Sequence, residues 1–227
     1  MYYPGNKNIP GLIQKIVNQI PPCTDFYELF AGTAAVSTFL SRGSTEKPIF
    51  HINDLDPHVA DNFVYPSGSI ISNLPAVDII KFLSTLPAHL NFFVFIDPPY
   101  HHTTRPFNKE LYKFEMSHID HIELLSSVQD LKCNCMIIHP QCELYDNSLK
   151  HFRTVQIKVR YHRKSSIVNL YMNYPQPTQL LLYGVAGKDC WDRQRIKRKG
   201  DRLVKKLQSL PDVERNYILS RLSISFQ

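Results

Sequence analysis

Short apolar runs alternate with longer amphipathic stretches along the first three quarters of the chain. The runs are rich in β-branched and aromatic residues, which is typical of strands. They predict seven strands, at 25–30, 48–53, 69–72, 92–97, 133–139, 154–160 and 167–173. The stretches between them predict helices at 8–20, 33–42, 56–63, 75–86, 117–130 and 142–150.

The order of these elements indicates an α/β fold. Short, continuously apolar strands separated by helices predict a doubly wound, mostly parallel sheet with helices on both faces. The last two strands are separated only by HRKSS, which is too short for a crossover connection. We therefore expect the sheet to end in an antiparallel hairpin.

The pattern changes near Tyr174. NYPQPTQ is a proline-punctuated connector, and two further helices are predicted at 189–209 and 211–223. Pro211 suits the first turn of the second helix, where a missing N–H costs nothing. The sequence thus predicts a main domain at 1–174 and a helical C-terminal appendage at 175–227.

Composition narrows the class of protein. With 227 residues and 43% hydrophobic content, the chain can form a sizeable core. It has no apolar run of roughly 18 residues, so we expect no contact with a membrane. The N-terminus lacks a charged region followed by an apolar core, and the five cysteines form no regular disulfide framework. These features favour a cytoplasmic location.

The positive charge is concentrated in one segment. Residues 188–206 hold nine Lys/Arg and three Asp/Glu, which accounts for the whole net charge of +6. A solvated helix face is the simpler interpretation of such a run. Because the excess is so concentrated, a polyanionic partner is favoured.

Three strand ends carry candidate chemistry. Strand 25–30 runs into a turn, FAGTAA, in which Gly32 allows close approach of a ligand to the backbone. Strand 48–53 is followed by Asp54, which could accept the ribose hydroxyls of an adenosine-containing cofactor or simply cap the next helix. Strand 92–97 ends in Asp-Pro-Pro-Tyr at 97–100. Asp-Pro alone is a common turn, but the full tetrapeptide after a buried strand is more specific.

In this order, these motifs resemble those of the Dam-like (D12) adenine-specific DNA methyltransferases. The N-terminal YYPGNKNIPGLIQKI is similar to that family's opening segment, and the resemblance covers roughly residues 1–175. It implies a Rossmann-like methyltransferase fold, S-adenosylmethionine as methyl donor, and no metal. It also implies that the cofactor is contacted by Tyr3, Lys7, Asp54 and Asp97, with a methionine-side turn formed by Glu28, Phe30 and Gly32.

The chemistry of methyl transfer gives the motif residues roles. Asp97 and Glu28 would offset the charge of the sulfonium, and Lys7 would meet the cofactor carboxylate. Asp97 and the Pro98 carbonyl would accept the two hydrogens of the target amine. Pro98 and Pro99 stiffen this clamp, and Tyr100 offers a stacking face to an extruded base.

The sequence departs from the family in one respect. Only 42 residues separate Asp54 from Asp97, so the large helical recognition insertion of site-specific members is missing there. Two basic regions could compensate. We expect base contacts from the segment 101–114, with Arg105, Lys109 and Lys113, and phosphate contacts from the basic helix, with Arg195, Lys199 and Arg202.

The leading interpretation is a site-specific DNA adenine-N6 methyltransferase of restriction-modification or phage type. We expect a monomer that binds DNA, with a cognate restriction endonuclease as a candidate partner. The alternatives are an RNA adenine or N4-cytosine methyltransferase with the same clamp, and a catalytically dead DNA-binding relic. A glutamine-methylating enzyme is disfavoured because such enzymes usually have Asn at the position of Asp97.

A zinc site is a further alternative. It could be drawn from His118, His121, Cys133 and Cys135. However, Ser117-x-x-Asp120 predicts a capping box at the start of a helix. The two cysteines alternate along a strand. We therefore expect no metal.

Overall fold

The computed structural model describes residues 7–9, 11–43, 47–105, 111–161 and 164–225. Tyr3 and Lys109 of the predicted sites lie outside these residues. The chain divides into two compact units, Met1–Tyr183 and Gly184–Gln227, which are described separately. The domain assignment 1–174 and 175–227 stays a prediction.

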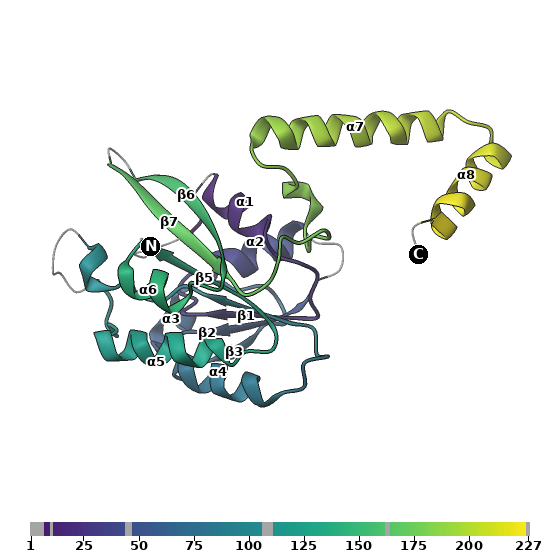
Figure 1. Ribbon diagram of the computed structural model, residues 1–227. Coiled ribbons are helices and arrows are strands. Elements are labelled where there is room, and N and C mark those ends of the chain that lie inside the picture. The colour runs from purple at the N-terminus through teal and green to yellow at the C-terminus, as the bar shows by residue number, and fades with distance from the viewer. Residues whose placement is uncertain (1–6, 10, 44–46, 106–110, 162–163, 226–227) are drawn as a thin grey trace. The chain divides into compact units, whose positions relative to one another are not determined.

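A seven-stranded sheet forms the centre of the first unit, with the strand order β3-β2-β1-β4-β5-β7-β6 (Figure 1). Neighbouring strands from β3 to β5 are parallel, whereas β7 is antiparallel to both β5 and β6. The predicted mostly parallel sheet that ends in an antiparallel hairpin is therefore confirmed. The strands are β1 Asp25–Leu29, β2 Ile49–Asn53, β3 Ile70–Ser72, β4 Phe92–Ile96, β5 Asn134–Pro140, β6 Arg153–Tyr161 and β7 Lys164–Met172.

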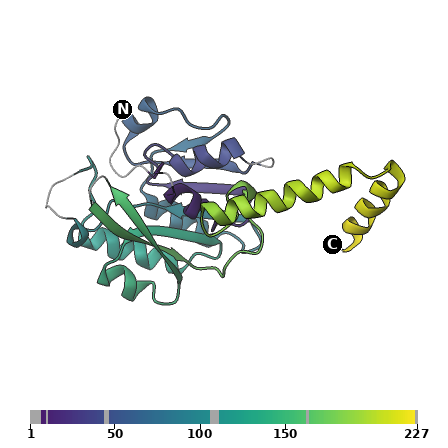
Figure 2. The ribbon, with the colours of Figure 1, turned by 90° about the horizontal axis from the view of Figure 1, so that it is seen from above.

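Helices cover both faces of this sheet, with α1 and α2 on one side and α4 and α5 on the other (Figures 1 and 2). The central strand β4 is buried on both faces, since Phe93, Val94, Phe95 and Ile96 are all at most 1% exposed. This explains its uninterrupted apolar sequence. The helices are α1 Leu12–Val17, α2 Ala35–Gly43, α3 Pro57–Asn62, α4 Ala76–Thr85, α5 His118–Gln129 and α6 Glu143–Ser148, with a 3-10 turn η1 at His102–Thr104.

Local capping chemistry sets where these helices begin. The predicted capping box is present at α5, where Ser117 and Asp120 each accept a backbone N–H from the other residue. The helix predicted at 8–20 is shorter in the structure. It begins at Leu12 because Gly11 has φ 89°, which is incompatible with a right-handed helix.

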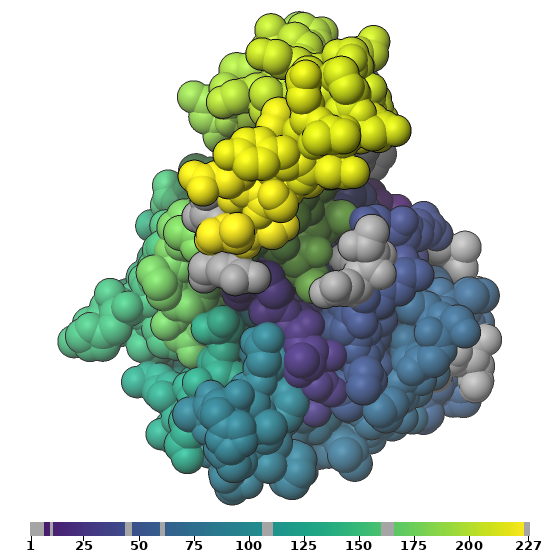
Figure 3. All heavy atoms as spheres, turned by 90° about the vertical axis from the view of Figure 1, so that its right-hand side faces the viewer, coloured from purple at the N-terminus to yellow at the C-terminus, as the bar shows by residue number. Residues whose placement is uncertain are grey.

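The second unit contains α7 Cys190–Gln208 and α8 Asp212–Ser225, close to the two predicted helices, after a 3-10 turn η2 at Tyr183–Val185. Asp189 caps α7 by accepting the N–H of Asp192. No residue of α7 is buried. Figure 3 shows the side chains of both helices, in yellow-green and yellow, at the molecular surface. In the described part of the chain, no helix is long and apolar enough to cross a membrane.

Candidate active site

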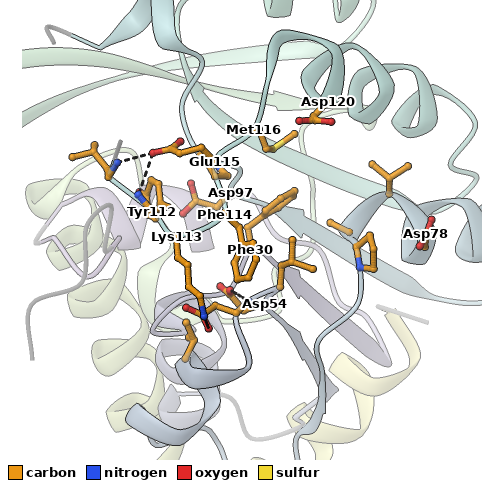
Figure 4. Close-up of a pocket in the computed structure, with 18 of the residues that line it drawn as sticks. Phe30, Asp54, Asp78, Asp97, Tyr112, Lys113, Phe114, Glu115, Met116 and Asp120 are labelled. Carbon is orange, nitrogen blue, oxygen red and sulfur yellow. Dashed lines mark hydrogen bonds and ion pairs between the residues drawn. The ribbon is translucent and has the colours of Figure 1, made fainter. Parts of the chain in front are cut away.

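The carboxyl ends of β1, β2 and β4 meet at one edge of the sheet. Because β1 pairs in parallel with both neighbours, Leu29 lies opposite Asn53 on one side and Ile96 on the other. The next residues of the three strands, Phe30, Asp54 and Asp97, therefore lie together. All three line one pocket (Figure 4). Its volume of about 470 Å³ is in the usual range for small-molecule sites.

The turn after β1 is pinned to the end of β2. The Gly32 N–H donates to Asp54 Oδ2 at 2.8 Å, and the Ala31 N–H donates to the Asn53 carbonyl at 2.9 Å. Phe30 and Ala34 have φ of 58° and 46°, in the left-handed region that non-glycine residues rarely adopt. Such strained backbone is common at ligand sites, and it places Phe30 in the wall of the pocket.

The carboxylate of Glu28 is hydrogen bonded to the first turn of α2. One carboxylate oxygen accepts the Val36 N–H at 3.2 Å, and the other accepts the Ser37 N–H and hydroxyl at 2.7 and 2.5 Å. Burial raises the pKa of Glu28 to about 7, although these hydrogen bonds oppose the shift. Its predicted contact with the cofactor stays a prediction, and the structure gives it the role of fixing the turn.

Asp54 links the turn to the pocket. Oδ2 accepts from Gly32, and Oδ1 accepts the Asp56 N–H at 3.0 Å. Each carboxylate oxygen can accept a further hydrogen bond from a ribose hydroxyl. The alternative interpretation of Asp54 as a helix cap is wrong, because α3 is capped by Asp56, which accepts the N–H of His58.

Asp97 forms a buried ion pair with Lys7. The Lys7 Nζ is 2.5 Å from Asp97 Oδ2, and the two side chains are only 4% and 15% exposed. The same ammonium lies 5.2 Å from the centre of the Tyr100 ring. Burial raises the pKa of Asp97, and Lys7 counteracts this by charge and hydrogen bonding. Lys7 was expected to meet a cofactor carboxylate, and in the structure it contacts the clamp itself.

The loop after the clamp is held by His139, at the end of β5. The His101 N–H donates to His139 Nε2 at 2.9 Å, while His139 Nδ1 lies 2.7 Å from the Pro140 carbonyl. These contacts require a neutral ring with its proton on Nδ1. Burial accordingly lowers the pKa of His139 to about 3. The ring is stacked on Tyr145 at 3.7 Å. Sequence reasoning missed His139, although its position at the end of the strand next to β4 was a usable signal.

Arg105 ties the clamp to the wall of the pocket. Its Nε donates to the Tyr100 carbonyl at 2.7 Å, and its two terminal nitrogens donate to Glu115 at 2.8 and 2.7 Å. Glu115 also accepts the backbone N–H groups of Leu111 and Tyr112 (Figure 4). Although burial opposes it, hydrogen bonding from Arg105 and these amides lowers the pKa of Glu115 to about 2. We call this arrangement the Arg105–Glu115 strap.

The strap holds the segment 111–116 against the pocket, and every residue of that segment lines it. Lys113 reaches across to Asp56 at 3.4 Å. The predicted base contacts of Arg105 and Lys113 stay predictions. In the structure, Arg105 binds Glu115 of the pocket wall, and Lys113 lines the pocket. The strap was missed because it joins residues ten positions apart in a part of the sequence without a periodic pattern.

The three predicted phosphate-binding residues lie on α7 in the second unit and are exposed. Arg195 is hydrogen bonded to Asp192 at 3.0 and 2.7 Å, and Arg202 donates to the Arg198 carbonyl. Lys199 is likewise exposed. Their contact with a polyanion stays a prediction.

Among the described residues, no group of three or more His, Cys, Asp or Glu side chains is arranged to hold a metal ion. His118 Nδ1 lies 2.9 Å from His101 Nε2, and His121 Nδ1 lies 2.9 Å from the Tyr145 hydroxyl. The two histidines of the alternative zinc site thus make hydrogen bonds to His101, which follows the Asp-Pro-Pro-Tyr motif, and to Tyr145.

The strand order and the terminal hairpin define the fold class. The sheet has the order of a doubly wound, Rossmann-like α/β fold. No protein-family profile and no curated protein sequence matches the chain.

Several solved structures are similar to the chain in fold. M. capricolum TrmK in complex with S-adenosylhomocysteine is 10% identical, with a TM-score of 0.44 over 93% of each chain. Human methyltransferase-like protein 13, also with S-adenosylhomocysteine, is 13% identical, with a TM-score of 0.46 over 92% of each chain. TrmN from Thermus thermophilus is 12% identical, with a TM-score of 0.47 over 70% of this chain and 46% of that protein.

Proposed function

We propose that the chain is an S-adenosylmethionine-dependent methyltransferase that modifies the exocyclic amine of a nucleobase, namely N6 of adenine in DNA. One observation carries this proposal. The Asp-Pro-Pro-Tyr motif follows β4 directly, and its Asp97 and Pro99 line the same pocket as Asp54 and Phe30. A clamp for an amino group and a site suited to a nucleoside cofactor are thus adjacent.

The pocket residues fit the cofactor. Asp54 is placed to accept ribose hydroxyls, and Phe30 and Phe114 provide apolar faces for an adenine ring (Figure 4). Asp97 supplies negative charge near a sulfonium. S-adenosylmethionine would supply an electrophilic methyl group: the lone pair of the amine nitrogen would form the new bond to the methyl carbon, and the electron pair of the broken C–S bond would stay on sulfur.

The chain's own residues prepare the amine for this transfer. Asp97 and the Pro98 carbonyl accept its two hydrogens, which concentrates the nitrogen lone pair on the side facing the methyl group. Pro98 and Pro99 are buried and have fixed φ angles, so these acceptors are preorganised. Tyr100 stacks on the base. The nitrogen then releases one proton to the carboxylate or to water.

The second unit is the proposed nucleic-acid contact. Residues 184–227 hold eleven Lys/Arg and five Asp/Glu, while the rest of the chain is neutral overall. The basic side chains at 198 and 199 follow 195 by three and four residues and precede 202 by four and three, so the four form one stripe along α7. Such a stripe matches the phosphates of a nucleic-acid backbone.

The segment between Asp54 and Asp97 does not distinguish DNA adenine from the alternative substrates. Residues 55–96 form the helices α3 and α4 and the sheet strands β3 and β4, so this segment has no separate recognition domain. Base recognition must come from elsewhere, and RNA adenine or cytosine N4 is compatible with the same clamp.

The test is methyl transfer from labelled S-adenosylmethionine to three substrates: DNA from a host without adenine methylation, its denatured single strands, and RNA. The products are digested and identified by mass spectrometry, with Asp97→Ala as the matched control. We expect N6-methyladenine in DNA and none with the variant. Label found only in RNA, or only as N4-methylcytosine, would establish the corresponding alternative. A folded chain that does not bind the cofactor would be a relic.

A further inference from the structure

Lys7 occupies a buried position in front of the clamp. Its backbone carbonyl accepts the Ile9 N–H at 2.7 Å, and the Ile9 carbonyl accepts the Leu12 N–H at the start of α1. These bonds fix the entry into the helix and direct the Lys7 side chain inward. The Lys7 side chain is 4% exposed, and its ammonium lies 2.5 Å from Asp97 Oδ2.

Burying an ammonium ion is costly unless it is paired, and the pairing here is with the carboxylate of the proposed clamp. A residue needed only for a cofactor carboxylate would have no reason to be placed on Asp97. The 5.2 Å approach to the Tyr100 ring adds a second contact with the clamp. The ion pair is therefore part of the clamp's own construction.

The charges around Asp97 show what the pair does. Four groups contact or couple to it: Lys7 before α1, Glu28 on β1, Tyr112 in the pocket wall, and Tyr145 on α6. The Tyr100 ring faces Lys7. Lys7 contributes positive charge, whereas Glu28 contributes negative charge when ionised. Burial and Glu28 favour protonation of Asp97, and Lys7 opposes it.

We propose that Lys7 is a positioning residue that keeps Asp97 ionised and oriented, so that its carboxylate can accept a hydrogen from the target amine. A protonated carboxyl would present an O–H donor to an N–H donor, and the clamp would fail. The ion pair between Lys7 and Asp97 is observed in the structure. Its effect on methyl transfer rests on the proposed function.

The direct test measures the ionisation of Asp97 without any substrate. Carbon-13 NMR of the aspartate carboxyl groups is recorded against pH, with the Asp97 signal assigned by its loss in Asp97→Asn. In Lys7→Met, which retains an apolar stem without the charge, we expect the midpoint of Asp97 to rise by roughly 1–3 pH units. Lys7→Arg retains the charge, and its midpoint should remain closer to that of the wild type. An unchanged midpoint in folded Lys7→Met would overturn the proposal.

A second measurement needs no variant at Lys7, in case Lys7→Met does not fold. In wild-type protein labelled with nitrogen-15 at lysine, the Lys7 Nζ signal should shift at the same pH as the Asp97 carboxyl carbon, because the two groups are coupled at 2.5 Å. An Nζ signal that does not respond to the ionisation of Asp97 would also overturn the proposal.

The activity arm separates this role from simple cofactor binding. In Lys7→Met, the acid limb of the methyl-transfer rate should move to higher pH by the same amount as the Asp97 midpoint, and raising the pH should restore much of the rate. Weaker cofactor binding with an unmoved pH profile would instead assign Lys7 to the cofactor carboxylate and refute the inference. If the NMR shift occurs but the wild type methylates no substrate, the proposed function fails and the ion-pair role stands.

Discussion

The Arg105–Glu115 strap should be worth several kilocalories per mole, and a double-mutant cycle can measure it. Arg105 donates three hydrogen bonds, one to the Tyr100 carbonyl and two to Glu115, and the two side chains are 11% and 22% exposed. Removing one member of a buried ion pair costs about 3–5 kcal/mol. Because this pair is partly exposed, we expect about 2–3 kcal/mol for Arg105→Ala or Glu115→Ala alone.

The coupling free energy between Arg105 and Glu115 isolates their interaction better than either single variant does. Urea unfolding of the wild type, both single variants and the double variant should give a coupling of roughly 1.5–3 kcal/mol, since residues in direct contact are not additive. The coupling should disappear in acid. The pKa of Glu115 is lowered to about 2 from its ordinary 4.5, so the stabilisation is complete above pH 4.5 and is lost as the pH falls toward 2.

The same variants should weaken cofactor binding, because the strap holds the pocket wall 111–116 in place. Calorimetry with S-adenosylmethionine checks this. Additive single effects, with a coupling below about 0.5 kcal/mol, would refute the strap. If Arg105→Ala leaves unfolding and cofactor affinity unchanged but weakens nucleic-acid binding, the base contact predicted from the sequence is the correct role.

Four further changes follow from the site. Asp97→Ala and Asp97→Asn should both abolish methyl transfer without changing the circular dichroism spectrum, and activity in either would contradict the clamp. Asp54→Ala should weaken cofactor affinity by about 1–3 kcal/mol in calorimetry; unchanged affinity would limit Asp54 to holding the Gly32 turn. The pKa of His139 is lowered to about 3, so near and below pH 6.5 the unfolded state binds more protons than the folded state. This difference at His139 should lower the free energy of unfolding by about 2 kcal/mol between pH 7 and pH 5. His139→Gln keeps an acceptor and should remove that portion of the pH dependence in urea titrations. Charge reversal on α7 should flatten the salt dependence of nucleic-acid binding while leaving stability unchanged, and an unchanged slope would make the helix a solvated face; the positions are Arg195, Lys199 and Arg202.

Much of the fold could be predicted from the sequence because its signals are local. Strands buried on both faces, such as β4, are apolar at every position, and caps such as Ser117 mark helix starts directly. The largest error in a strand occurs at the start of β7, which begins at Lys164 and was predicted from 167. Its first three residues are polar (Lys164, Ser165 and Ser166) and pair only with β6, beyond the edge of β5, so the segment lacks the apolar signal.

The site was predictable to the extent that parallel strands bring their carboxyl ends together. Phe30, Asp54 and Asp97 follow adjacent strands, and the sequence therefore placed them in one site. The ion pair between Lys7 and Asp97 joins residues ninety positions apart, and nothing in the local sequence of either residue specifies the other. Its discovery requires the three-dimensional structure.

The segment from Asp97 to Arg105 shows why these non-local contacts matter for function. The Asp97 N–H still donates to the Leu29 carbonyl of β1 at 3.4 Å, but Pro98 and Pro99 have no N–H to donate, so regular backbone bonding cannot continue beyond Asp97. Side chains from other parts of the chain hold the rest of the segment: Lys7 binds the Asp97 carboxylate, His139 accepts the His101 N–H, and Arg105 donates to the Tyr100 carbonyl. Because Arg105 also binds Glu115 in the pocket wall, one side chain connects that wall to Tyr100. If Tyr100 stacks on the target base as proposed, a cofactor that orders the wall would also order the ring that receives the base.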